Sequence, residues 1–162
     1  MTVENLNVSN CTVGIEIAYT DNSMVTNSTA NSNSEHGIFI YHSYNNTIIN
    51  NTANSNGKYG IYLSGVSKNN SISNNIANSN SKHGICIYNS YNNIIENNIV
   101  SLNNESGIYF DASSNNSISN NTLSNNSYGI YVSTSNLLVI SQNNNLHHRS
   151  MLATDAVIRN MV

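Results

Sequence analysis

The sequence lacks proline and tryptophan, and only 8% of its 162 residues carry a charge. Its five lysine and arginine residues form no basic stripe, so we expect no nucleic-acid partner. No apolar run approaches the length of a transmembrane helix, and the first residues show no signal peptide. We therefore expect no membrane span, and a chain that is a piece of a longer repeat array or lacks its targeting segment.

In place of charge and proline, the chain has asparagine, serine and a regular repeat. It contains 37 asparagine and 26 serine residues, and six of its glycines are each followed by an apolar, a variable and an apolar residue. These glycines are Gly14, Gly37, Gly60, Gly84, Gly107 and Gly129, at intervals of 23, 23, 24, 23 and 22 residues. A fixed period in this range is typical of stacked supersecondary units that cannot bury their apolar faces alone.

Each repeat contains three short strand-like pieces. The apolar residues one and three positions after the glycine alternate with variable residues, as in a strand with one buried face. A second apolar anchor follows, then an Asn-Asn step and a small or apolar pair; the anchors are Val25, Ile48, Ile72, Ile95 and Ile118. No segment is long and amphipathic enough for a helix. The sequence predicts an all-β parallel β-helix of about six coils, roughly 29 Å long.

Asparagines recur at one corner of the predicted coil. They are Asn51, Asn75, Asn98 and Asn121. Asparagine tolerates the left-handed backbone conformation, and its amide can bond to the coils above and below. We predict that these residues stack and satisfy polar groups that the corner would otherwise leave unpaired.

The pattern of Gly-Ile-x-Ile, then Asn-x-Ile-x-Asn-Asn, then a polar turn resembles the right-handed β-helix repeats of the pectin-lyase-like superfamily. It is most similar to carbohydrate-binding and sugar-hydrolase type repeats and to NosD-type periplasmic proteins, repeats that are also common in archaeal surface proteins. The resemblance covers residues 1 to about 141. It implies a right-handed, single-stranded parallel β-helix and an extracellular, cell-surface or periplasmic location.

Pairs of coils form a larger repeat. Residues 36–46 return as residues 83–93, 47 positions later, and residues 60–75 are echoed by 107–121. These pairs of coils have duplicated together. The two cysteines, Cys11 and Cys86, lie about three coils apart in this arrangement, which is too far for a disulfide.

The repeat stops after Ser141, which divides the chain into a β-helix at 1–141 and a C-terminal segment at 142–162. A β-helix exposes an unpaired strand edge at each end, and such an edge favours aggregation unless it is covered. We predict that the C-terminal segment caps one end. A homo-oligomer formed through exposed β-helix ends is a further hypothesis.

Candidate catalytic and metal-binding residues do not group in the sequence. The eight carboxylates have different offsets from the glycines, and Glu35 and Glu105, which share an offset, lie about 14 Å apart. The resemblance to NosD suggests copper, for which the candidate ligands are His36, His42, His83, His147, His148, Cys86 and Met24. His36 and His83 are about 10 Å apart, too far to hold one ion. We predict no catalytic residue, no metal site and no cofactor.

The strongest candidate site is aromatic. The outward position two after the glycine holds Phe39, Tyr62, Tyr109 and Tyr131, with Glu16 and Cys86 in the other repeats, and Tyr41 and Tyr88 lie at neighbouring outward positions. Laddered tyrosines flanked by asparagine and serine could stack on sugar rings and bond to their hydroxyls. The alternative is cross-strand packing, because aromatic residues also stack on in-register neighbours.

These observations predict a non-catalytic, extracytoplasmic β-helix module that acts as a surface spacer or a polysaccharide-binding platform. The predicted glycan-binding residues are Phe39, Tyr41, Tyr62, Tyr88, Tyr109 and Tyr131. Two alternatives stay open, a fragment of a polysaccharide lyase or hydrolase and a NosD-like copper-handling protein.

Overall fold

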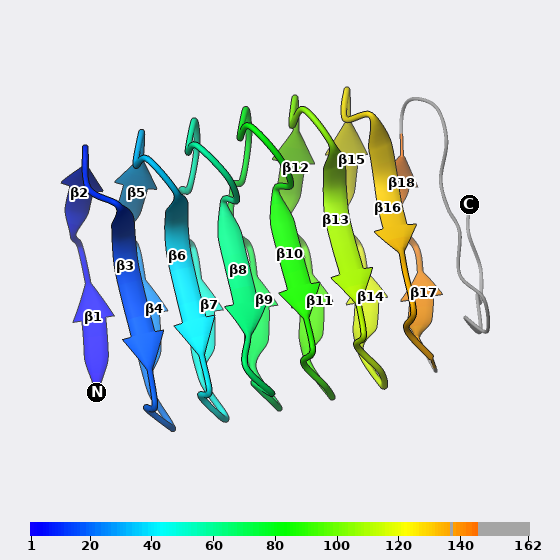
Figure 1. The fold of residues 1–162 in the computed structure, drawn as a ribbon, viewed down its shortest axis with the longest axis horizontal. Helices are drawn as coiled ribbons and strands as arrows, with labels where there is room; N and C mark the ends of the chain where they lie inside the picture. The colour runs from blue at the N-terminus through cyan, green and yellow to red at the C-terminus, as the bar shows by residue number, and fades with distance from the viewer. Residues whose placement is uncertain (137, 146–162) are drawn as a thin grey trace.

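The structure is a computed structural model that describes residues 1–136 and 138–145. The chain winds through three layers of short parallel strands, and the coils stack along the long axis (Figure 1). No helix occurs in the described residues, so none there could cross a membrane. The predicted all-β parallel β-helix of about six coils, with three strand pieces per coil, is confirmed.

The three layers differ in length. The seven-stranded sheet contains β1 (Thr2–Glu4), β4 (Met24–Thr26), β7 (Thr47–Ile49), β9 (Ser71–Ser73), β11 (Ile94–Glu96), β14 (Ser117–Ser119) and β17 (Val139–Ser141). The six-stranded sheet, which carries the glycine repeats, contains β3 (Val13–Ala18), β6 (His36–Tyr41), β8 (Ile61–Ser64), β10 (Ile85–Tyr88), β13 (Ser106–Asp111) and β16 (Tyr128–Val132). The third layer consists of a two-stranded sheet, β2 (Asn7–Ser9) and β5 (Thr29–Asn31), and a three-stranded sheet, β12 (Ile99–Ser101), β15 (Thr122–Ser124) and β18 (Asn144–Asn145). Isolated bridges through Thr52 and Ile76 connect the two sheets.

The core is a set of apolar columns that run the length of the stack. Register places each residue beside its equivalent in the next coil: Ile38 pairs with Ile61, and Ile61 with Ile85. Ile38, Ile61 and Ile85 are fully buried, as is the second anchor Ile48. Because each buried column packs against its own repeats, the stack explains why isoleucine recurs at fixed offsets.

The asparagine stack predicted at one corner is confirmed, and the structure contains two more. The three columns are Asn51, Asn75, Asn98, Asn121 and Asn143; Asn33, Asn56, Asn80, Asn103 and Asn126; and Asn46, Asn70, Asn93 and Asn116. At Asn98, the backbone N–H and the side-chain amide both donate to Asn121 Oδ1 at 2.9 Å, and the amide also donates to the Ile72 carbonyl. These bonds pair corner groups that burial would otherwise leave unsatisfied.

The exposed residue before each buried asparagine turns the chain. Asn50, Asn74, Asn97 and Asn120 all adopt the left-handed conformation, with φ between 55 and 58°. Asparagine tolerates this conformation better than most residues. The Asn-Asn step therefore has two roles, a left-handed corner followed by a buried hydrogen-bonding group.

The repeated glycine is required by close packing inside the coil. A Cβ on Gly37 would lie 2.7 Å from the Gly60 carbonyl oxygen and 2.8 Å from the Ala30 carbonyl oxygen. Gly37 therefore faces the interior, as does the buried Ile38 that follows it. The inward-outward alternation breaks at this point, and His36, the residue before the glycine, projects to the outer face.

The described residues extend the repeat slightly past Ser141. Asn143 joins an asparagine column, and β18 pairs with β15. Residues 146–162 lie outside the described structure, so the predicted C-terminal cap and the predicted end-to-end oligomer stay predictions. Cys11 is exposed and Cys86 is buried, and both are free thiols, as the coil spacing predicted.

Candidate functional site

The predicted aromatic row lies on the outer surface of the six-stranded sheet. Backbone pairing places Phe39 beside Tyr62, Tyr62 beside Cys86, Cys86 beside Tyr109 and Tyr109 beside Tyr131. The rings stack on each other where they are neighbours: the Phe39 and Tyr62 centroids are 5.0 Å apart with an interplanar angle of 9°. The tyrosines of this row are half-buried.

A second row lies beside the first and was missed by the sequence analysis. It consists of the residues immediately before the glycines: Val13, His36, Tyr59, His83, Ser106 and Tyr128. Tyr59 stacks on His36 at 5.0 Å and on His83 at 5.3 Å, and His83 stacks on Tyr109 of the first row at 4.4 Å. We refer to these two rows together as the aromatic face. If inward and outward residues alternated strictly along each strand, counting back from the buried isoleucine would place the residues of the second row inside the coil.

The remaining two predicted residues occupy different surroundings. Tyr41 packs against Tyr19 and His42, with centroid distances of 5.5 and 4.3 Å, at the corner that follows β6. Tyr88 is 44% exposed and lies at the end of β10, where it pairs with Asp111. Only Tyr88 of these two lines a hollow on the aromatic face.

Two small residues interrupt the aromatic face, and each opens a hollow. Cys86 occupies an aromatic position in the first row, and the hollow there has a volume of about 300 Å³; we call it the Cys86 hollow. Ser106 does the same in the second row, beside a hollow of about 510 Å³, the Ser106 hollow. Both hollows are lined by His83, Glu105 and Tyr109, which form their common wall.

The wall residue His83 is held as a neutral imidazole. Its Nδ1 accepts a hydrogen bond from the Ser106 backbone N–H at 3.2 Å, which leaves the ring proton on Nε2. That Nε2 lies 3.2 Å from Glu105 Oε2. Burial lowers the pKa of His83 to about 4, and the neighbouring Lys82 ammonium lowers it in the same direction.

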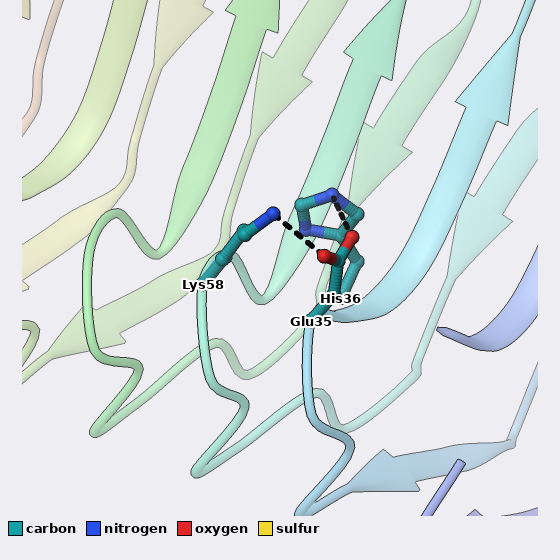
Figure 2. A network of polar contacts seen from close by, with 3 residues as sticks. All are labelled: Glu35, His36 and Lys58. Carbon is teal, nitrogen blue, oxygen red and sulfur yellow. Dashed lines mark hydrogen bonds and ion pairs between the residues drawn. The ribbon is translucent and has the colours of Figure 1, made fainter. Parts of the chain in front are cut away.

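The equivalent histidine 47 residues earlier has a different charged neighbourhood. Glu35 accepts a hydrogen bond from Lys58 Nζ at 2.7 Å, and its other oxygen lies 3.9 Å from His36 Nε2 (Figure 2). Lys58 lowers the pKa of Glu35, and burial lowers the pKa of His36 to about 4. His36 Nδ1 is buried and has no hydrogen-bond partner among the described residues.

The fold is that of a pectin-lyase-like parallel β-helix protein. Within that class the chain belongs to the NosD family, described as periplasmic copper-binding protein, which matches residues 1–111 and 53–149. No curated protein matches the chain.

Several solved structures share the fold. The chain is 26% identical to the periplasmic alginate epimerase AlgG over 88% of its own length, with a TM-score of 0.84. It is 15% identical to the A-module of the mannuronan C-5 epimerase AlgE4 from Azotobacter vinelandii, covering 98% of this chain and 57% of that one, with a TM-score of 0.81. Tailspike protein 2 of an Escherichia coli O157:H7 bacteriophage is 16% identical over 97% of this chain and 23% of its own, with a TM-score of 0.68. The chain spans 35% of the AlgG chain.

The residues described by the structure do not fit the copper ion that the family description implies. No group of three or more His, Cys, Asp or Glu side chains there is placed to hold a metal ion. His83 uses Nδ1 as an acceptor for Ser106. Burial, together with Asp111 and Glu105, raises the pKa of the Cys86 thiol and so disfavours the thiolate, the form in which a cysteine binds copper. His147 and His148 lie outside the described residues.

Proposed function

We propose that this chain is an extracytoplasmic β-helix module that binds a polysaccharide along the aromatic face of the six-stranded sheet. The observation that carries the proposal is the pair of hollows that meet at His83, Glu105 and Tyr109. Each hollow combines ring surfaces, which can stack on the apolar face of a sugar, with carboxylate and hydroxyl groups that can bond to its hydroxyls, and the Ser106 hollow adds the Asn104 amide.

Cross-strand packing accounts for part of the aromatic face but leaves the hollows unexplained. A face selected only for ring stacking would be served by an unbroken row, as between Phe39 and Tyr62. At Cys86 and Ser106 the stacking is broken, and polar side chains from neighbouring coils surround the gaps. This arrangement is typical of a surface that receives a ligand with both apolar and polar faces.

The relatives support the class of ligand and the location. AlgG is named as an alginate epimerase and AlgE4 as a mannuronan epimerase, so two proteins of this fold are named for action on polysaccharides. The NosD family and AlgG are both described as periplasmic. A role outside the cytoplasm fits both descriptions.

Binding is favoured over catalysis by the state of His83. A general base needs a free lone pair directed at the substrate. In His83, Nδ1 is occupied by the Ser106 N–H and Nε2 carries the proton, so the imidazole has no lone pair to offer. Burial also raises the pKa of Tyr109 and disfavours a phenolate base.

The test is a titration of tyrosine fluorescence with a panel of polysaccharides. We expect saturable binding to at least one glycan, weakened about tenfold or more in a Tyr62→Ala/Tyr109→Ala variant, since buried aromatic contacts contribute about 1.4 kcal/mol or more each to such interfaces. Tyr91→Ala is the matched control, because Tyr91 lies between β10 and β11 and lines neither hollow.

Two outcomes would contradict this function. Absence of binding across a broad panel, or binding unchanged in the double variant, would remove the aromatic face as a polysaccharide site. Release of unsaturated or reducing sugar during incubation would instead favour the lyase or hydrolase alternative.

A further inference from the structure

The Cys86 hollow exists because one position of the first aromatic row lacks a ring. The row runs from Phe39 to Tyr131, and Cys86 is its one residue without an aromatic ring. In the duplicated segment 47 residues earlier, the equivalent position holds Phe39, which stacks on Tyr62 at 5.0 Å. Replacing this ring by a thiol removes one layer of the stack and leaves an open volume of about 300 Å³.

The hollow offers one ring face to a sugar. Tyr62 and Tyr109 pair with Cys86 from opposite sides, so their backbones stand two strand spacings, or about 10 Å, apart. His83, from the same coil as Cys86, stacks on Tyr109 at 4.4 Å and covers its ring on that side. Phe39 stacks on the far side of Tyr62, so the other face of the Tyr62 ring lines the hollow, and Cys86 itself, only 2% exposed, forms the floor.

The charges around the hollow select the kind of sugar. The lining residues include two carboxylates, Glu105 and Asp111, and one ammonium group, Lys82, which gives a formal charge of −1 (−2 + 1) with His83 neutral. Glu105 lies immediately before β13 and Asp111 is its last residue, so the two carboxylates lie at opposite ends of this strand. A sugar carboxylate would therefore meet more negative than positive charge, whereas a protonated amine would be attracted.

Resting on the proposed polysaccharide function, we propose that the Cys86 hollow is a subsite for one protonated amino-sugar ring. The ring stacks on Tyr62 above the Cys86 thiol, with the stacked His83 and Tyr109 on its other side. Its ammonium group is directed toward the carboxylate of Glu105 or Asp111. The subsite selects a glycan that carries free amino groups over a polyuronate.

The experiment measures binding of three tetrasaccharides by calorimetry: a chitosan tetramer, its fully N-acetylated counterpart and an oligogalacturonate. We expect the chitosan tetramer to bind more tightly than the other two and to weaken as salt is raised, because salt screens exposed charges. A Glu105→Gln/Asp111→Asn variant is expected to lose this preference for the amine.

The decisive variant fills the hollow and leaves the tyrosines in place. Cys86→Phe recreates the arrangement seen at Phe39 and is expected to weaken chitosan binding about tenfold or more. Glu16→Phe is the matched control: it adds the same ring at the equivalent outward position of β3, outside both hollows, and is expected to bind like the unaltered protein. Cys86→Leu, a smaller blocking residue, replaces Cys86→Phe if circular dichroism shows that the latter does not fold.

The outcomes separate this inference from the proposed function. Chitosan binding retained in the folded blocking variant, or oligogalacturonate binding as tight as chitosan binding, overturns the amino-sugar subsite. If either of these results is obtained, and the glycan that binds is no longer bound by the Tyr62→Ala/Tyr109→Ala variant, the polysaccharide function stands without this subsite. Failure of every glycan in the broad panel removes both.

Discussion

The segments around His36 and His83 have nearly the same sequence, yet their outer surfaces differ. Inside the coil, the isoleucines that follow the glycine are fully buried in both segments. Outside, the first segment presents a continuous stack in which Phe39 lies on Tyr62, and the second has Cys86 and a hollow. Interior positions are constrained by identical neighbours in the coils above and below, whereas an outward position can change without disturbing the stack.

The charges beside the two histidines are also reversed. Glu35 precedes His36 and is paired with Lys58 in the next coil, while Lys82 precedes His83 and the next coil supplies Glu105. The Glu35 carboxylate is therefore neutralised by an ammonium group at 2.7 Å, whereas Glu105 lines both hollows. The two segments share a repeat, but the first is closed by a continuous aromatic stack, and the second, which we call the open segment, has a hollow.

The asparagine columns should be equally important in both segments, and their loss should have the largest effect. Asn51→Ala and Asn98→Ala each remove a buried side chain that bonds to two neighbouring coils. We expect each to lower the free energy of unfolding by about 3–5 kcal/mol, because several buried polar groups lose their partners. Urea denaturation measures both variants.

The matched control for the asparagine prediction is Asn97→Ala. Asn97 is exposed and in the left-handed conformation, so its replacement should cost only about 1–2 kcal/mol. If Asn97→Ala cost as much as Asn98→Ala, hydrogen bonding within the column would not be the source of the stability. A much smaller loss at Asn51 than at Asn98 would show that the two segments differ inside as well as outside.

Acid should destabilise both segments through their histidines. The pKa of His36 and of His83 is about 4, below the value of about 6.5 in an unfolded chain. The unfolded state therefore binds more protons between pH 6.5 and 4, so this stabilisation is complete above pH 6.5 and decreases as pH falls toward 4. His36→Phe and His83→Phe should each flatten the pH dependence of the free energy of unfolding. If the pH dependence of the free energy of unfolding were unchanged in both variants, the histidines would not be the source of the acid sensitivity.

At neutral pH the same two substitutions should change the free energy of unfolding by different amounts. His83 Nδ1 accepts from the Ser106 N–H, whereas His36 Nδ1 is buried without a partner. We expect His83→Phe to lower the free energy of unfolding by about 1–2 kcal/mol and His36→Phe to leave it nearly unchanged. Equal losses at pH 7, measured by urea denaturation, would mean that the Ser106 contact does not distinguish the two histidines.

The sequence predicted the parts of the molecule that every coil repeats. The isoleucine columns and the Asn98 column follow from fixed offsets, and Tyr62 and Tyr109 were placed on one row by strand alternation. The Asn56 and Asn70 columns recur with the same period, so the sequence carried a signal for them too. These features depend on position in the repeat, which a single sequence displays directly.

The second aromatic row and the charge pairs were not predicted, for two different reasons. His83 and Tyr59 face outward only because Gly84 and Gly60 face inward. A strand in which inward and outward residues alternate strictly would place His83 and Tyr59 inside the coil. Lys58 shares the offset of Glu35 in the adjacent repeat, so that ion pair could have been found by aligning the coils. The hollows depend on how side chains from neighbouring coils pack, and no pattern in the sequence predicts them.

The most direct test of the account is to map glycan contacts residue by residue. In a heteronuclear NMR titration with the chitosan tetramer, we expect chemical-shift changes that centre on Cys86, Tyr62 and Tyr109 and extend toward Glu105. The equivalent residues around Phe39 and Glu35, away from Tyr62, should change little. Changes centred on Phe39, or on the outer surface of the seven-stranded sheet, would contradict the claim that the open segment is the binding site.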